Sequence, residues 1–344
     1  MQVLIIGGTN FIGPHVVRYL LGMGHQVTVF HRSNSKADLP PQVHHLLGDR
    51  HHLVEMKNEF ERLSPQVVVD MIPYTEEDAL TTINTFKGIT QRLVVISSID
   101  VYRAYGVLRR IESGLVEPVP LTEDSALRQQ LYPFQHLSQR PLNRPIDYEK
   151  ILVERVVMSD PDLPGTILRL PMVYGPGDDR HRLLPYLQRM DDNRHAIVLA
   201  ENIAQWRSSY GYVENVAAAI ALVTTNERAS KSIYHIADQE VFTEAEWINK
   251  IGEIARWQGK VVSVPQDYLP SEWKLDLNID QHWFIDTTRI RQELGYSDAI
   301  NLDEALKRTI DWEKFHSPTE ISPQTIPWLL SYATEDAILT AVKG

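Results

Sequence analysis

The stretch that most restricts the fold is the glycine-rich sequence GGTNFIG at residues 7–13. It lies between a short apolar run, QVLII at 2–6, and a stretch with helical periodicity at 14–24, so the order is strand, turn and helix. In this context a glycine-rich turn is typical of dinucleotide-binding units, in which the pyrophosphate lies at the helix N-terminus and meets free backbone amides. The stretch therefore predicts dinucleotide binding, with a purely structural loop as the alternative.

The glycines of this turn have separate roles. Gly8 allows the tight turn, and Gly13 allows the helix to pack closely on the strand. Asn10 stands where the usual pattern has its middle glycine. Because asparagine tolerates a left-handed backbone better than most residues, the turn is expected to persist. The residues expected to contact the cofactor here are Gly7, Gly8, Asn10, Phe11, Ile12 and Gly13.

The first half of the chain alternates strands rich in valine and isoleucine with helical stretches. Such alternation predicts a parallel sheet covered by helices on both faces, which is a Rossmann-type doubly wound α/β domain. After the first strand, further strands are predicted at 26–32, 43–49, 66–72, 92–98 and 165–170. Helices besides the one at 14–24 are predicted at 53–63 and 77–86.

Composition narrows the range of functions. The 344 residues suffice for about two domains, and the absence of cysteine excludes disulfides, thiolate metal sites and a cysteine nucleophile. The histidine pairs at 44–45 and 51–52 lack the spacing of a helical metal motif, so no metal site is predicted. No apolar run approaches the ~20 residues of a membrane span, and the start lacks the features of a signal peptide, so a cytoplasmic protein is expected. A net charge of −11 disfavours a nucleic-acid surface.

The end of the second predicted strand bears on the choice of cofactor. An acidic residue there would bind the ribose hydroxyls of NAD, whereas a basic one accommodates the 2′-phosphate of NADP. The sequence offers His31 and Arg32, followed by Ser33 and Lys36, with no acid before Asp38. We therefore predict a preference for NADP over NAD, with a merely solvated basic turn as the alternative.

Several stretches, in this order, resemble the extended and atypical short-chain dehydrogenase/reductases of the NAD-dependent epimerase/dehydratase family. GGTNFIG is similar to the family's cofactor turn, and LLGDR resembles the segment whose aspartate, here Asp49, lies near the adenine. VISSIDVY at 95–102 resembles the strand that carries the catalytic serine, here Ser98. EKILVE at 149–154 resembles the helix that carries the catalytic lysine, here Lys150, which in the family also binds the nicotinamide ribose.

The resemblance continues into the C-terminal half. LRLPMVYGPGD at 168–178 is close to the segment whose backbone lines the nicotinamide, which would place Pro171 and Val173 there. YGYVENVAAAIAL, YHIADQEVFTEAEWINKIGEIA and DTTRIRQELGY follow in the family's order, and the resemblance ends near residue 315.

The resemblance implies two domains, in which a smaller α/β domain caps the cofactor and holds the substrate. The dinucleotide-binding domain would comprise 1–170 with about 211–239, and the substrate-binding domain 171–210 with 240–344.

The resemblance also implies partners. Substrates of the family are often nucleotide sugars, which makes Arg207 and Tyr210 candidates for contacts to substrate phosphates, with an exposed loop arginine as the alternative for Arg207. Members commonly form homodimers through the helix that starts near the lysine. The apolar positions that would allow such a contact are Ile151, Leu152, Val156 and Val157.

The family's catalytic tyrosine is missing from its usual place, four residues before the lysine. Here that place holds Ile146, which transfers no proton, and Tyr148 lies only two residues before Lys150. Pro145 predicts a helix that begins before Ile146, because proline is favoured at the first helical position. Positions two apart on a helix are rotated by roughly 200°, so Tyr148 would then point away from Lys150. A helix that begins at Asp147 is the alternative.

Three functions remain open. The first is an NAD(P)-dependent enzyme that acts on a sugar nucleotide or related small molecule. It would retain Ser98 and Lys150 and use another tyrosine for proton transfer, with Tyr102 and Tyr74 as the candidates. The second is a non-catalytic NAD(P)-binding sensor or scaffold. The third is an RNA-binding protein, because the GGT, VTVFHR, GDR and SSIDVY stretches are also similar to the chloroplast stem-loop RNA-binding proteins, atypical members of the same family. The negative net charge opposes this third function.

Overall fold

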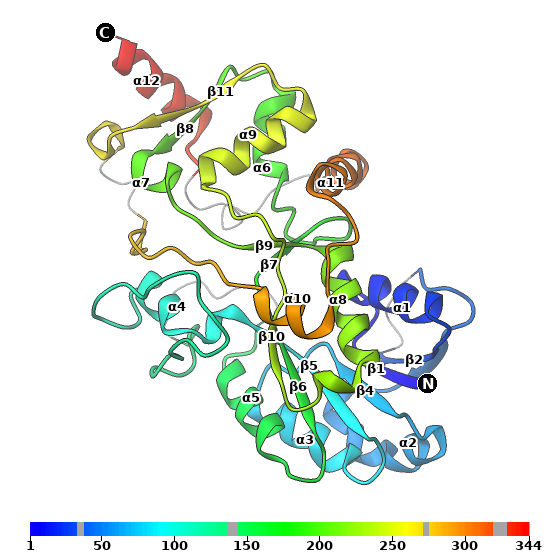
Figure 1. Cartoon of the computed structure of the whole chain (residues 1–344). Coiled ribbons are helices and arrows are strands. Elements are labelled where there is room, and N and C mark those ends of the chain that lie inside the picture. The colour runs from blue at the N-terminus through cyan, green and yellow to red at the C-terminus, as the bar shows by residue number, and fades with distance from the viewer. Residues whose placement is uncertain (33–37, 136–143, 271–274, 319–328, 344) are drawn as a thin grey trace.

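The computed structural model describes residues 1–32, 38–135, 144–270, 275–318 and 329–343 (Figure 1). Its centre is a seven-stranded sheet made of β1 (Gln2–Ile6), β2 (Gln26–His31), β3 (His44–Leu47), β4 (Val67–Asp70), β5 (Arg92–Ser98), β6 (Gly165–Leu170) and β10 (Ile233–His235). All neighbouring pairs are parallel, and the order is β10-β6-β5-β4-β1-β2-β3. The direction in which successive strands are added reverses between β1 and β4, and ligands of such sheets bind at the carboxyl ends of the strands at this point.

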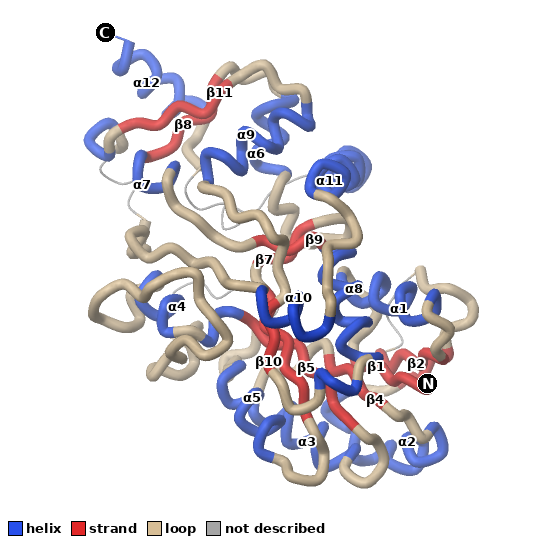
Figure 2. Tube along the Cα trace, viewed as in Figure 1, coloured by secondary structure: helices blue, strands red, loops and turns tan. Residues whose placement is uncertain are grey.

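Helices cover both faces of this sheet (Figure 2). In β1, Val3 and Ile5 pack into one hydrophobic cluster, whereas Leu4 and Ile6 pack into another on the opposite face. Strands that are buried on both faces are continuous apolar runs in the sequence, which makes them readily predictable. The first cluster includes residues of α1 (Ile12–Gly22) and α8 (Val213–Thr225), and the second includes residues of α2 (Lys57–Leu63), α3 (Glu76–Phe86) and α5 (Lys150–Ser159).

A second group of elements lies beyond the carboxyl ends of the strands, in the upper half of Figure 1. Two small parallel sheets belong to it, in which β7 (Met172–Tyr174) pairs with β9 (Tyr210–Tyr212) and β8 (Ala196–Ala200) pairs with β11 (Lys260–Val264). Its helices are α6 (Leu184–Asp191), α7 (Glu201–Ala204), α9 (Glu244–Ala255), α11 (Leu302–His316) and α12 (Tyr332–Lys343). The remaining elements are η1 (Arg50–Met56), η2 (Ile99–Val101), α4 (Arg103–Leu108), η3 (Glu227–Ala229), η4 (Gln266–Tyr268) and α10 (Thr288–Leu294).

The structure confirms the predicted α/β class and doubly wound parallel sheet. All six predicted strands are present, although β2, β3 and β4 are shorter than predicted. The sequence does not predict β10, whose three residues are too few to produce a distinct pattern. The helix predicted at 53–63 is divided into the 3₁₀ helix η1 and the helix α2 at Met56, whose backbone angles of φ −100° and ψ 14° are not helical.

Of the four apolar positions on α5 that would allow a homodimer, two are buried within the protomer. Ile151 and Val157 are buried in the protomer, whereas Leu152 and Val156 are half-buried. A homodimer through α5 therefore stays a prediction. None of the helices in the described part of the chain has both the length and the apolar character needed to cross a membrane.

Candidate active site

The glycine-rich turn has the backbone that a dinucleotide requires. Gly7 has a φ of +83°, a conformation that side chains rarely adopt. A Cβ on Gly13 would lie 2.4 Å from the carbonyl carbon of Gly8, so helix and turn can approach this closely only without a side chain. The left-handed position expected at Asn10 falls instead on Phe11, with a φ of 47°.

The start of α1 suits a pyrophosphate. The helix has no side-chain cap and no acidic residue in its first turn, so its free amides and its dipole are available to an anion. The loop that follows β7 lies against this turn, since a Cβ on Gly177 would be 3.5 Å from the Cα of Phe11. These features fit a bound dinucleotide, which the turn residues named above would hold.

The carboxyl end of β2 is basic. His31 contacts His45 of the neighbouring strand, with 2.8 Å between the Nε2 of His31 and the Nδ1 of His45, and Arg32 is exposed. Asp49 lies close by, and the backbone amide of His51 holds its carboxylate and lowers its pKa. Ser33 and Lys36 lie outside the described residues.

The helix that carries Lys150 begins later than predicted. Its first residue is Lys150, and Glu149 is the N-cap, whose side chain accepts a hydrogen bond of 2.9 Å from the backbone amide of Ile151. The predicted start at Pro145 is wrong, and the alternative start at Asp147 is wrong as well. A long-range ion pair explains the difference, because the fully buried guanidinium of Arg128 lies 3.1 Å from the Glu149 carboxylate and fixes the cap.

The turn before this helix determines where Tyr148 points. Ile146 is 56% exposed, whereas Tyr148 is buried. The Tyr148 hydroxyl donates a hydrogen bond of 2.8 Å to Asp100 Oδ2, and burial together with the charge of Asp100 raises the pKa of Tyr148 well above its ordinary value. Its proton is therefore already engaged.

Lys150 lies in the interior beside the strand ends. Its Nζ donates hydrogen bonds of 2.6 Å to the carbonyl oxygen of Pro73 and 2.8 Å to that of Ile96. Burial and the positive charge of Arg144 lower the pKa of Lys150 to about 7. An ammonium has three donors, so one remains for a ligand in addition to these two carbonyls.

Tyr74 lies beside this lysine. It follows the carboxyl end of β4, is half-buried, and its ring centroid is 5.2 Å from Lys150 Nζ. Its carbonyl oxygen accepts a hydrogen bond of 2.9 Å from the Glu149 amide, which ties the loop of Tyr74 to the start of α5. Its own amide donates 2.8 Å to Asp78, whose carboxylate is 3.0 Å from Arg50 Nε.

Tyr102, the other candidate, is placed differently. It is fully buried, and its hydroxyl accepts a hydrogen bond of 2.6 Å from Arg169 and contacts His235. Burial raises the pKa of this hydroxyl. The group is part of a buried polar network that extends through Arg169 to Glu154, and this position argues against a role in proton transfer to a substrate.

The remaining predicted residues lie at two places. Ser98 ends β5, is half-buried, and accepts a hydrogen bond of 3.2 Å from the Asp100 amide. Pro171 directly follows Leu170, the residue of β6 that pairs with Ser98, and Val173 lies in β7. These residues therefore surround the same strand ends as Lys150.

Arg207 and Tyr210 belong to a different segment, since Tyr210 begins β9 and Arg207 lies three residues before it. Arg207 is exposed, and Tyr210 stacks on Trp247 with 4.7 Å between ring centroids. Within the described ranges, neither makes a hydrogen bond, ion pair or ring contact with Lys150 or Tyr74. Their predicted contact with substrate phosphates stays a prediction.

The sequence reasoning missed three charged residues of this site. Asp100 Oδ2 accepts the hydrogen bond from the Tyr148 hydroxyl, and its other oxygen, Oδ1, has no hydrogen-bond partner among the described residues. Arg144 lies over the rings of Tyr74 and Tyr148, and Arg50 positions the Tyr74 loop through Asp78. Asp100, two residues after Ser98 at a strand end, could have been recognised from its position; Arg144 and Arg50 gave no local signal.

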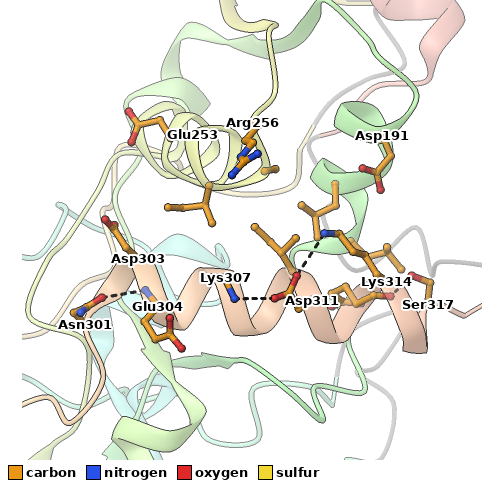
Figure 3. Close-up of a pocket in the computed structure, with 16 residues that line it drawn as sticks. Asp191, Glu253, Arg256, Asn301, Asp303, Glu304, Lys307, Asp311, Lys314 and Ser317 are labelled. Atoms are coloured by element: carbon orange, nitrogen blue, oxygen red, sulfur yellow. Dashed lines mark hydrogen bonds and ion pairs between the residues drawn. The ribbon is translucent and has the colours of Figure 1, made fainter.

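A separate cavity of about 720 Å³ lies between α6, α9 and α11 (Figure 3). Carboxylates and cations line it together, and in Figure 3 Lys307 and Lys314 both point toward Asp311 on the α11 helix. None of the predicted site residues lines this cavity. It is therefore distinct from the site at the strand ends.

Comparisons with known proteins concern the family and the fold of the chain. A profile of the NAD dependent epimerase/dehydratase family matches residues 3–237. The chain is 24% identical over 327 residues to the chloroplast stem-loop binding protein of 41 kDa b of Arabidopsis thaliana, with 89% of this chain and 77% of that protein covered. It is 25% identical over 309 residues to 2'-dehydrokanamycin reductase of Streptomyces kanamyceticus, with coverage of 87% and 79%.

Solved structures share the fold. The UDP-glucose 4-epimerase of Thermotoga maritima, determined with UDP-glucose, aligns with a TM-score of 0.66 at 19% identity over 92% of this chain and 99% of that one. The dTDP-glucose 4,6-dehydratase of Bacillus anthracis, determined with NAD, aligns with a TM-score of 0.66 at 16% identity over 92% and 97%. At these identities the likeness establishes the fold alone.

Proposed function

The chain belongs to the NAD-dependent epimerase/dehydratase family, and from this premise we propose that it is an NAD(P)-dependent enzyme acting on a sugar nucleotide or a related small molecule without the family's usual tyrosine. The observation that carries the proposal is the position of Tyr74. It is a half-buried phenol at the carboxyl end of β4, with its ring 5.2 Å from Lys150 Nζ. Tyr148 has its proton engaged by Asp100, and Tyr102 has its hydroxyl enclosed by Arg169 and His235.

In the proposed reaction, Tyr74 exchanges a proton with the substrate oxygen at its phenolic oxygen. The bound dinucleotide supplies the hydride acceptor and donor. Lys150 and Arg144, whose charged groups lie 5.2 Å and 4.6 Å from the Tyr74 ring centroid, offset the negative charge that develops when the phenol gives up its proton. Ser98 donates a hydrogen bond to the substrate oxygen from the adjacent strand end.

We infer a preference for NADP. The support is the basic end of β2, where His31 and His45 contact each other and Arg32 is exposed beside them. A guanidinium at this place accommodates a 2′-phosphate, whereas residues 26–32 hold no carboxylate for the ribose hydroxyls of NAD. Calorimetric titration with both dinucleotides tests this, and tighter binding of NAD would contradict it.

A non-catalytic NAD(P)-binding protein is the second candidate. It is favoured by the two backbone carbonyls that Lys150 Nζ already binds, since such bonds give the lysine a structural role without catalysis. An RNA-binding function has in its favour the similarity to the chloroplast stem-loop binding protein, and against it a net charge of −11.

Tyr74→Phe tests the enzyme proposal. The protein is incubated with NADP and with UDP-glucose, dTDP-glucose and UDP-glucuronate, and turnover is followed by the absorbance of the reduced nicotinamide and by NMR of the sugar. We expect Tyr74→Phe to lower turnover by about a hundredfold or more, which is the contribution of a general acid or base, with cofactor affinity unchanged. Tyr268→Phe, at an exposed tyrosine, is the matched control.

The outcomes separate the candidates. Loss of turnover in Tyr148→Phe but not in Tyr74→Phe would show that Tyr148 is the proton-transferring group. Absence of turnover with every sugar nucleotide, together with intact dinucleotide binding, would favour the non-catalytic protein.

A further inference from the structure

Arg144 is a cation with few partners inside the site. It is half-buried, and its guanidinium carbon lies 4.6 Å from the ring centroid of Tyr74 and 5.2 Å from that of Tyr148. Burial lowers the pKa of this guanidinium, but the neighbouring Tyr148, Tyr74 and Asp100 raise it above its ordinary value. No carboxylate of a described residue lies within ion-pair distance of it. A guanidinium has five N–H donors, so most of its donors remain open.

Other arginines with little exposure in the described part of the chain have charged or carbonyl partners. Arg128 and Arg169 lie 3.1 Å and 2.6 Å from glutamate carboxylates, and Arg50 lies 3.0 Å from Asp70. Arg92 donates to three backbone carbonyl oxygens. Moving a charge out of water is costly without such partners. The position of Arg144 therefore points to a partner that the described part of the chain does not supply.

The charges around Arg144 also favour an anion. Arg144 and Lys150 are close enough for the charge of each to disfavour that of the other. The carboxylate that faces both is Asp100, and it is shared with the Tyr148 hydroxyl. Asp70 also acts on Lys150 but is paired with Arg50, so Asp100 is the carboxylate that acts on Arg144, and an anionic ligand would balance this guanidinium.

We propose that Arg144 binds an oxyanion of the substrate, a carboxylate on the sugar or a phosphoryl oxygen of its nucleotide, and that it thereby makes the site specific for acidic sugars or their nucleotides. The proposal rests on the proposed function, because Tyr74 and Lys150 mark where the reacting carbon lies. A planar guanidinium presents paired N–H donors that match a carboxylate or phosphate in two parallel hydrogen bonds, which a lysine cannot reproduce.

The test is equilibrium binding to Arg144→Met, Arg144→Lys and the wild type. The probes are UDP-glucuronate and UDP-glucose, which differ in having a carboxylate or a hydroxymethyl group on the sugar. Each protein is saturated with the reduced form of whichever dinucleotide it binds more tightly, so that the sugar cannot be oxidised, and is titrated by calorimetry. Arg155→Met is the matched control, since Arg155 is an exposed arginine on α5.

We expect Arg144→Met to weaken binding of UDP-glucuronate by about tenfold to a hundredfold, the range for a lost hydrogen bond to a charged group. Arg144→Lys should recover only part of this affinity, and Arg155→Met should bind as the wild type does. A loss confined to UDP-glucuronate assigns Arg144 to a sugar carboxylate, and an equal loss for both probes assigns it to the phosphoryl groups.

Equal binding by the wild type and Arg144→Met, whether tight or absent, overturns the inference. Dinucleotide affinity is measured in parallel and should be the same in all variants. Because this experiment measures binding with no turnover, its failure is separate from the failure of the proposed function, which depends on the turnover of Tyr74→Phe.

Discussion

Replacing Lys150 with methionine should change the stability of the protein in a pH-dependent way. The side chain of Lys150 is 3% exposed, and burial with the charge of Arg144 lowers its pKa from 10.5 to about 7. At about 1.4 kcal/mol for each pH unit, this lowering corresponds to about 5 kcal/mol of free energy. Methionine has a similar length and carries no charge, so it removes the titration and retains most of the packing.

The sign follows from proton binding. Between pH 7 and 10.5 the unfolded chain binds a proton at Lys150 that the folded chain does not, so the free energy of unfolding of the wild type rises with pH across this window. The stability gained from the lowered pKa is complete above 10.5 and is lost as the pH falls through about 7. The variant has no such dependence. Its stability relative to the wild type should therefore be greatest near pH 6 and decrease by about 3 kcal/mol by pH 9.

Urea unfolding followed by tryptophan fluorescence measures this difference, since the chain has seven tryptophans. Wild type, Lys150→Met and the control Lys260→Met, at an exposed lysine of β11, are unfolded at several pH values between 6 and 9. The difference between wild type and Lys260→Met should stay constant with pH. A constant difference for Lys150→Met as well would refute the reasoning, because it would mean that the buried lysine keeps its charge at no cost.

Two further predictions concern the turn and the helix cap. Gly13→Ala places a Cβ 2.4 Å from the backbone of Gly8 and should weaken dinucleotide binding by about tenfold or more in calorimetry. Gly22→Ala, at a position with open space around it, should leave the affinity unchanged. Equal affinities of the two variants would contradict this role of the turn. Glu149→Gln leaves the fully buried Arg128 without its ion pair and should lower the free energy of unfolding by about 3 kcal/mol, against little change for a substitution at an exposed glutamate.

The sheet was predictable because its strands are buried on both faces. Val67 to Asp70 and Arg92 to Ser98 form apolar runs with few polar residues, and such runs alternating with helices leave few other folds. The cofactor turn was predictable for a similar reason, since close packing of a helix on a strand requires glycine at positions such as Gly13.

The start of α5 was not predictable from local sequence. Pro145 and Asp147 are ordinary helix-start signals, but the cap is Glu149, and Arg128, 21 residues earlier in the chain, holds it. The choice between Tyr74 and Tyr102 was hidden in the same way. Both tyrosines follow predicted strands. Contacts with residues distant in the sequence, such as His235, enclose Tyr102, whereas Tyr74 stays half-buried.

The proposed role of Tyr74 fits the geometry at the start of α5, where Ile146 stands four residues before the lysine. Residues 145–148 form a turn, closed by a hydrogen bond of 3.3 Å from the Tyr148 amide to the Pro145 carbonyl, so position 146 does not lie on the helix with Lys150. Tyr74 reaches the lysine from the loop after β4 instead, and the hydrogen bond from the Glu149 amide to its carbonyl fixes that loop to the helix cap. Glu149, which caps α5, therefore also holds the loop of Tyr74 beside Lys150. The proposed proton-transferring group thus depends on the Arg128–Glu149 ion pair, although both side chains of this pair are fully buried.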